Sequence, residues 1–241
     1  IRRMLANYER MFHEEVPKKK VHSPLVKGDH PELDETEFCD ELNKRHYLSM
    51  IGQLQWAVTL GRFDIMCAVN AMSRYRPQPR VGHMDRVKRM YQYLATYPEC
   101  SIKFNTEMPD YSMYMKIAKP TDWGYVYHPC KEEIPSDAPE PKGKPVRHTV
   151  FCDANLMANV VNGKSNIGIL HMVNKTPIDW YSKSTSTVET STYGTEFCAA
   201  SAAVDQIVDI RYTLCMLGVP IWRMKHHISL VTTSVLLTVL H

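Results

Sequence analysis

Apolar side chains recur at helical spacing in the stretch that begins at Tyr47. The series breaks at Gly61, so the pattern predicts two packed helices rather than one long helix. A third amphipathic helix is predicted from His83 to Thr96, and Pro98 ends it. The apolar positions of the first two helices are Tyr47, Met50, Ile51, Leu54, Trp56, Ala57, Val58, Phe63, Ile65, Met66, Val69 and Met72.

Strand-like segments replace the helical pattern later in the chain. Residues 148–152, 167–173 and 178–181 are rich in β-branched and aromatic side chains and are separated by turn signals, which predicts an antiparallel meander. Residues 187–217 then predict a long helix that ends before Gly218 and Pro220. Two further strand-like pieces, 101–104 and 111–117, come earlier. The buried face of the long helix is predicted to comprise Phe197, Ala200, Val204, Ile207, Val208, Tyr212 and Leu214.

A proline-rich segment separates the two patterns. Residues 130–147 contain four prolines between Pro135 and Pro145, with alternating charge, which predicts a stiff connector and a domain boundary. Residues 47–129 then form a mainly helical region and residues 148–241 an α/β domain. Residues 1–46 show little apolar periodicity, so we expect an extended arm that packs on something absent, or a solvated tail. Because the chain opens on Ile1 without a methionine, we expect a piece of a longer translation product.

Composition excludes some classes of protein. The chain is 44% hydrophobic and 23% charged, which is ordinary for a folded protein, and its net charge of +3 gives no global argument for a nucleic-acid partner. Seven cysteines without a CxxC pair predict reduced thiols in an intracellular protein, cytoplasmic or nuclear, and no zinc site. No signal-like apolar run opens the chain. The apolar C-terminal tail has about thirteen residues, fewer than the roughly twenty of a membrane span.

A basic stretch lies between and within the second and third predicted helices. Six arginine and lysine side chains fall within sixteen residues and alternate with tyrosines. Such a stretch could follow a phosphate backbone while the aromatic rings support it. A solvated helix face is the alternative, since most charge runs have that role. The candidate nucleic-acid-binding residues are Arg74, Arg76, Arg80, Arg86, Lys88 and Arg89.

Two carboxylates occupy positions typical of a metal-dependent nuclease. Asp153 follows an apolar strand segment, and Glu196 falls in the first turns of the predicted long helix. A carboxylate at a strand end and another on the covering helix can share a divalent ion. Each also has a structural explanation, because aspartate is common at strand ends and the helix dipole favours an early glutamate. The histidines His148, His171, His226 and His227 show no metal-ligand spacing and are interpreted as surface or strand residues.

Several sequence blocks occur together in a specific order. Residues 47–54, 62–65 and 68–75 read YLSMIGQL, RFDI and AVNAMSRY, and residues 177–183 and 191–197 read PIDWYSK and STYGTEF. The first set is similar to the thumb and connection region of copia-type retrotransposon polyproteins, downstream of the reverse-transcriptase palm. The second set resembles the ribonuclease H domain of the same polyproteins. The resemblance covers most of the chain, to about Pro220, and the polymerase block Tyr-x-Asp-Asp does not occur.

This resemblance implies a fold and a chemistry. The implied fold is α/β, a ribonuclease H-like mixed sheet with a long helix, preceded by a mainly helical connection region. In that family four carboxylates hold two Mg²⁺ or Mn²⁺ ions, which cleave RNA paired with DNA. Carried over by position, Asp153 and Glu196 are catalytic and metal-binding, whereas Asn155 stands where the family often has a second acidic residue. The implied partners are an RNA–DNA hybrid and an upstream polymerase segment, and no membrane.

The C-terminal part departs from the family. No acidic residue follows Asp209, so the third and fourth carboxylates are missing. We therefore expect an incomplete, C-terminally truncated domain with weak metal binding and little or no nuclease activity. If codons are read one base earlier, residues 232–234 can encode Asp-Asn-Gln, which indicates a frameshift between Met224 and Val231. Two alternatives stay open, namely a non-catalytic nucleic-acid-binding or connection module and an unexpressed relic.

Overall fold

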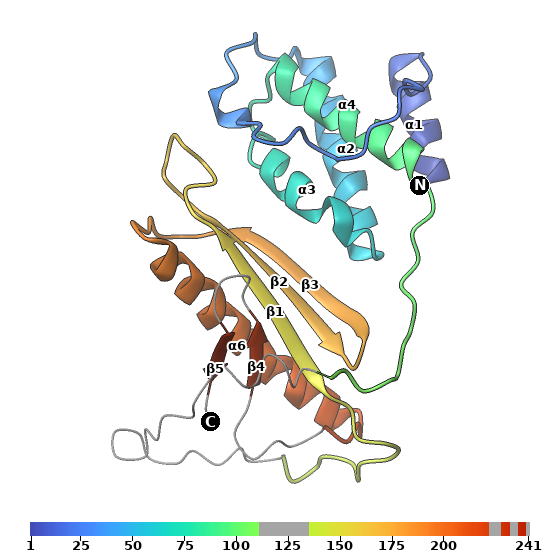
Figure 1. Cartoon of the computed structure of the whole chain (residues 1–241). Helices are drawn as coiled ribbons and strands as arrows, with labels where there is room; N and C mark the ends of the chain where they lie inside the picture. The colour runs from blue at the N-terminus through green and yellow to red at the C-terminus, as the bar shows by residue number, and fades with distance from the viewer. Residues whose placement is uncertain (111–134, 222–227, 232–235, 240–241) are drawn as a thin grey trace. The chain divides into compact units, whose positions relative to one another are not determined.

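The computed structural model describes residues 1–110, 135–221, 228–231 and 236–239, and Figure 1 shows its course. The chain divides into two compact units, residues 1–102 with the loop 159–163, and residues 103–158 with 164–241. The first unit is helical and the second combines a sheet with a helix, so the predicted α/β class is confirmed. The predicted strand at 111–117 and residues 224–227 of the frameshift window lie outside the described residues.

The first unit is built from short helices around one apolar core. The predicted helices from Tyr47 to Thr96 are confirmed, and Gly61 separates the first two by adopting a φ of 110°, which glycine tolerates best. The Asp40 carboxylate accepts a 2.7 Å hydrogen bond from the Asn43 amide and so caps the helix that follows. The elements are α1 (Arg2–Phe12), η1 (Pro31–Leu33), α2 (Glu41–Thr59), η2 (Phe63–Ile65), α3 (Met66–Ser73) and α4 (Val81–Thr96).

The N-terminal residues differ from the expected extended arm. Residues 2–12 form α1, and its Tyr8 is only 1% exposed, with a ring centroid 5.6 Å from that of Tyr91 on α4. Val16 and Val21, in the segment after α1, are also buried. The arm therefore packs on the chain's own core and not on something absent, because α1 supplies an apolar face that α2 and α4 would otherwise leave exposed.

The core of the first unit uses large side chains. Residues from α2, α3 and α4 that lie on the predicted apolar faces are fully buried, including Tyr47, Leu54 and Met72. Trp56 is an exception, since its side chain is 64% exposed although its position was predicted to belong to the apolar series. The buried set is Tyr47, Met50, Ile51, Leu54, Ile65, Met72, Val87, Met90, Tyr91 and Leu94.

The second unit contains a five-stranded mixed sheet in the order β3-β2-β1-β4-β5. The predicted meander is confirmed, because β1 (His148–Asn155), β2 (Asn166–Val173) and β3 (Thr176–Ser184) pair antiparallel in sequence. Strand β4 (Ile228–Val231) lies parallel to β1, and β5 (Leu236–Val239) is antiparallel to β4. In the 101–104 segment, which was predicted as strand-like, the structure has no strand.

The long helix α6 (Thr192–Met216) covers one face of the sheet (Figure 1). Its buried stripe is made of small residues, which let the helix approach β1 and β2 closely. The predicted buried face is rotated relative to this stripe, since Phe197 is 56% and Val208 42% exposed. Each residue turns a helix by about 100°, so the small residues beside them point inward instead. The buried helix residues are Thr195, Ala199, Ala200, Ala203 and Ile207.

The division between the two units lies earlier than the predicted connector. The Asn105 amide donates to the Thr176 hydroxyl at 2.8 Å, and the Asn174 side chain donates to the Thr106 carbonyl, so the segment after residue 102 docks at the β2–β3 turn. The proline-rich segment also belongs to the second unit. Within it the Val146 amide donates to the Pro220 carbonyl at 2.8 Å, just beyond α6. Hydrogen bonds between residues far apart in the chain, which composition does not reveal, thus hold both segments in the second unit.

Candidate functional site

The two candidate carboxylates lie on neighbouring elements of the second unit. Asp153 is exposed, near the end of β1, and pairs across the strands with Gly168 of β2. Glu196 is the fifth residue of α6 and is half-buried, with its Oε2 atom shielded from solvent. Ser191 starts this helix by accepting a 3.1 Å hydrogen bond from the Gly194 amide. Glu196 thus stands in the first turns of a helix that packs on the strand carrying Asp153.

Both carboxylates affect the pKa of the Cys152 thiol. This side chain is 3% exposed and packs in the seam between β1 and α6. Burial, and after it the negative charges of Glu196 and Asp153, raise the pKa of Cys152 to about 12. The thiol therefore stays protonated at neutral pH and behaves as a small apolar side chain. Because both charges act on this one thiol, Glu196 and Asp153 lie near the same part of β1.

The strand alternation places these two carboxylates differently. Val150 and Cys152 face α6, so Asp153, one residue further, belongs to the opposite and exposed face of the strand. Within the described residues, no set of three or more His, Cys, Asp or Glu side chains is placed to hold a metal ion. The donor set present does not fit a two-metal centre, because two such ions need a larger anionic cage than two carboxylates supply.

Four of the six basic candidates contact residues of the N-terminal segment 12–38. The Arg80 guanidinium lies 4.1 Å from the centre of the Phe38 ring and also donates to the Thr36 carbonyl. Lys88 lies 4.1 Å from the Phe12 ring centre and forms a 3.4 Å ion pair with Glu14. These contacts tie the N-terminal segment to α4. The basic stretch thus contributes to folding, whatever else it does.

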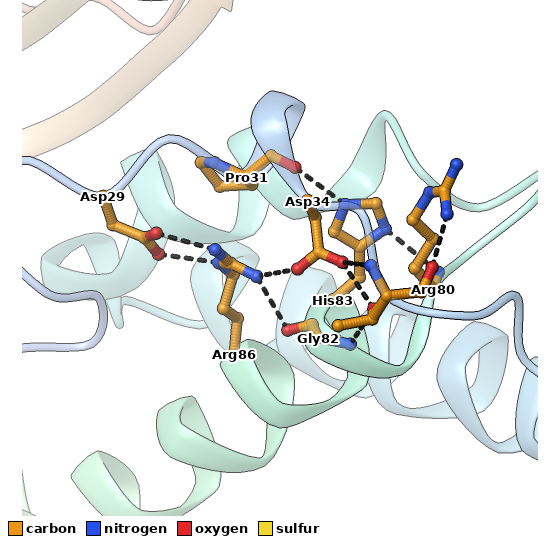
Figure 2. Close-up of polar contacts among 8 residues, drawn as sticks. Asp29, Pro31, Asp34, Arg80, Gly82, His83 and Arg86 are labelled. Carbon is orange, nitrogen blue, oxygen red and sulfur yellow. Dashed lines mark hydrogen bonds and ion pairs between the residues drawn. The ribbon is translucent and has the colours of Figure 1, made fainter.

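Arg86 is the centre of a polar cluster that we call the α4 clamp. The clamp joins residues 29–34 to the first turns of α4, as Figure 2 shows, and consists of Asp29, Pro31, Asp34, Gly82, His83 and Arg86. The Arg86 guanidinium donates to both oxygens of Asp29, at 2.7 and 2.8 Å, and also to Asp34 and to the Gly82 carbonyl. Because the planar Arg86 guanidinium binds two carboxylates at once, it fixes the position of residues 29–34 and also neutralises their charge.

Asp34 depends on these donors for its charge. Burial of the carboxyl favours the protonated form, but hydrogen bonds from Thr36 and Arg86 outweigh this effect and hold the pKa of Asp34 below its usual range. Hydrogen bonds with Asp29 first, and with Asp34 after it, raise the pKa of Arg86 against the opposing effect of burial. The pair is therefore ionised at neutral pH, and each partner needs the other.

His83 and Gly82 complete the clamp from α4. The His83 ring is 3% exposed; its Nδ1 accepts from the Arg80 amide at 3.1 Å and its Nε2 lies 2.9 Å from the Pro31 carbonyl. This arrangement is that of a neutral ring with the proton on Nε2, and burial lowers the pKa of His83 accordingly. A Cβ on Gly82 would lie 2.0 Å from Asp34 Oδ2, so the helix and the segment fit only with glycine there.

The other basic candidates have less fixed surroundings. Arg89 is half-buried and contacts the Ser23 hydroxyl at 3.4 Å. Arg76 is exposed, beyond the end of α3, and its guanidinium donates to the Ser73 carbonyl. Arg74 caps the end of the same helix and is partly exposed. Arg76 therefore keeps the most accessible charge of the six candidates.

Sequence reasoning missed several residues that the fold brings together. Asp29 and Asp34 were placed in an arm without defined contacts, yet both face α4. His148 and His171 lie on strands, which is one of the two predicted placements, but the sequence did not indicate that His171 is 0% exposed and hydrogen-bonded to His148. A histidine in the apolar alternation of β2 was the one available signal. The partners could not be found from spacing, because they lie more than twenty residues apart.

A pocket of about 730 Å³ lies in the first unit between α1 and α2. Its walls include the exposed Trp56, the Gly52 backbone and the side chains of Asn7 and Gln53, which are hydrogen-bonded to each other at 3.3 Å. The apolar pattern does not indicate this hollow, because it includes Trp56 among the apolar helix positions. The pocket contains none of the six basic candidates of the 74–89 stretch.

Comparison with known proteins gives one relevant similarity. No family model matches the chain, and no solved structure matches it. Over 60 residues the chain is 33% identical to the "Putative transposon Ty5-1 protein" of Saccharomyces cerevisiae. The aligned residues make up 25% of this chain and 20% of that protein, so the chain spans about one fifth of the length of its curated relative. The similarity supports a retrotransposon origin for the chain.

Among the described residues, no helix combines the length and the apolar character that crossing a bilayer requires. The six described cysteines are free thiols, in agreement with the prediction from their number and spacing.

Proposed function

We propose that the chain is a region of a copia-type retrotransposon polyprotein, in which a ribonuclease H-like unit follows a connection region and binds RNA–DNA hybrids with little or no cleavage. The observation that carries the proposal is the strand order β3-β2-β1-β4, with β1 parallel to β4, a helix on one face, and Asp153 and Glu196 on the strand and helix that pack together. The similarity to a transposon protein supports the same origin.

The low cleavage activity that we propose follows from the small number of carboxylate ligands available for a divalent ion. Mg²⁺ or Mn²⁺ would supply a water activated for attack on the phosphodiester. Asp153 and Glu196 are the residues proposed to approach such an ion, but the 241 residues contain no acidic side chain after Asp209 to join them. Asp153 also lies on the strand face opposite the α6 seam. With so few anionic ligands the ion binds weakly, so no cleavage step is assigned.

The proposed nucleic-acid-binding surface lies in the first unit and includes fewer residues than the six basic candidates predicted from the sequence. Arg86, Lys88 and Arg80 already contact carboxylate, aromatic or carbonyl groups of the N-terminal segment. Arg76 is exposed, and we propose it as the main phosphate contact, with Arg74 beside it. A phosphate contact makes affinity depend on salt but not on sequence.

One experiment separates nuclease from binding module. The full chain is incubated with a labelled RNA–DNA hybrid and Mg²⁺, and cleavage is followed on a gel beside Asp153→Asn, Glu196→Gln and the matched control Asp209→Asn. We expect no cleavage by any of the four proteins. Cleavage by the parent and by Asp209→Asn, lost in Asp153→Asn, would overturn the inactive assignment and establish an enzyme.

Binding is measured on the same proteins by fluorescence anisotropy over a range of salt concentrations. We expect affinity that falls as salt rises and that Asp153→Asn leaves unchanged. Arg76→Gln should lower the magnitude of the logarithmic salt slope by about one, whereas Arg45→Gln on α2 should not. No measurable hybrid binding at low salt would contradict the proposed module and leave the unexpressed relic, which absence of transcript would support.

The proposed frameshift has its own test in the genomic nucleotide sequence. A one-base offset between the codons of Met224 and Val231 should restore an Asp-Asn block in the region of residues 232–234. If neither alternative frame encodes that block, the frameshift proposal is wrong.

A further inference from the structure

A partly buried series of hydrogen bonds crosses the seam between the sheet and α6. His148 Nε2 on β1 lies 3.1 Å from His171 Nδ1 on β2, and His171 Nε2 lies 2.9 Å from Gln206 Oε1 on α6. The two ring centroids are 5.3 Å apart and the rings are inclined by 26°, so they meet nearly edge to edge. His171 is completely buried. A polar chain therefore joins two strands to the helix inside an apolar seam.

The Gln206 acceptor determines which ring nitrogens of His171 and His148 carry a hydrogen. Gln206 Oε1 accepts, so His171 Nε2 must carry a hydrogen and His171 Nδ1 must be a lone pair. That lone pair then accepts from His148 Nε2–H. Both rings are neutral in this arrangement, and each has a single permitted tautomer. Only His148 Nδ1 can take up a proton without breaking a bond of the chain.

The surroundings of the two histidines disfavour protonation of either ring. Burial first, then His171 and the Arg211 guanidinium of α6, lower the pKa of His148 to about 4. Burial also lowers the pKa of His171, although the Gln206 hydrogen bond and the Asp179 carboxylate of β3 act in the opposite direction. A proton added to either ring would place a positive charge beside its partner ring. Neutral histidines thus suit this seam and charged histidines do not.

We propose that the His148–His171–Gln206 chain is an acid-sensitive latch, which holds α6 against β1 and β2 at neutral pH and loosens it in acid. The latch does not depend on the proposed function, because none of its three residues contacts the hybrid or approaches the metal in that proposal. It would nevertheless affect the second unit as a whole, since α6 also positions Glu196.

The direction of the effect follows from proton linkage. A histidine whose folded pKa lies below its unfolded value of about 6.5 contributes stability above that value and loses it as the pH falls towards the folded value. For His148 this window runs from pH 6.5 to about 4. At pH 4.5 the equilibrium constant for opening of α6 should rise on the order of 50-fold from this residue alone.

The test follows α6 directly by hydrogen–deuterium exchange of peptides covering residues 199–207, between pH 7.5 and 4.5, corrected for intrinsic exchange rates. In the parent chain, protection should fall steeply below pH 6.5. His148→Gln, which keeps a donor for His171 but does not titrate, should flatten that fall, whereas His22→Gln at an exposed position of the first unit should leave it unchanged. Gln206→Leu should lower protection at every pH.

Two results would overturn the latch. One is a fall in α6 protection that is as steep in His148→Gln as in the parent chain. The other needs no variant and is independent of whether the variants fold: an NMR titration of the parent chain in which His148 shows an ordinary pKa near 6.5. A titration midpoint near the low value given above would support the latch.

Discussion

The two units join segments that are distant in sequence by different physical means. In the first unit the α4 clamp uses a half-buried cation between two carboxylates, at a helix start where glycine leaves room for them. In the second unit the seam formed by Ala199, Ala200 and Ala203 against β1 and β2 uses small apolar residues and neutral histidines. The clamp loses most when one charge is removed, whereas the seam loses most when volume or charge is added.

The clamp predicts the largest mutational effect. Arg86→Met keeps most of the side-chain volume but leaves Asp29 and Asp34 without their cation, at side-chain exposures of 17% and 6%. The first unit should lose about 3–5 kcal/mol of unfolding free energy, as measured by urea denaturation. Arg76→Met, at an exposed site, is the control and should change it by less than about 0.5 kcal/mol. Similar values for both variants would show that the clamp does not stabilise the unit.

The seam predicts an effect of intermediate size. Ala203→Leu adds volume at a fully buried position where α6 meets the sheet, and it should cost about 2 kcal/mol because the helix must move away. Ser201→Leu, on the exposed face of the same helix, adds a similar volume without a neighbour to displace. Thermal unfolding followed by circular dichroism compares the two. Equal melting temperatures would mean that the helix does not pack closely on its alanines.

A single methyl group in the clamp predicts the smallest effect. Gly82→Ala should destabilise the first unit by about 1 kcal/mol, because the new Cβ overlaps the Asp34 carboxylate and outweighs the gain in helix propensity. Gly52→Ala lies inside α2 with nothing near its Cβ and should instead stabilise the unit by up to about 1 kcal/mol. Urea denaturation should thus give opposite signs. A gain in both variants would mean that the segment yields easily to α4.

Periodicity was sufficient for most elements, because their own side chains form the pattern. The helical spacing of Tyr47 and Leu54 and the β-branched and aromatic side chains of residues 148–152 predicted a helix and a strand that the structure confirms. The buried face of α6 was predicted only in part: Ala200 and Ile207 are buried, but Phe197, which is larger and more apolar than the buried alanines, is exposed. Close helix–sheet packing favours small residues at the contact, and hydrophobicity alone does not reveal this.

The candidate site was predicted only in part, for a similar reason. Residue type and spacing selected Asp153 and Glu196, and the fold brings β1 and α6 together, although alternation turns Asp153 to the opposite face. The same reasoning selected Arg86, whose partners Asp29 and Asp34 lie more than fifty residues away. An arginine looks alike in sequence whether it meets a phosphate or a carboxylate of its own chain.

The sequence by itself determined the order of elements, since local periodicity, turns and caps act within a few residues of each other. It also determined the absence of acidic side chains after Asp209, which limits the metal chemistry available to these 241 residues. Only the tertiary structure decided which charges are paired, as at Arg86, and which histidines are buried, as at His171. Those outcomes depend on desolvation and on partners far along the chain, and both exist only once the chain has folded.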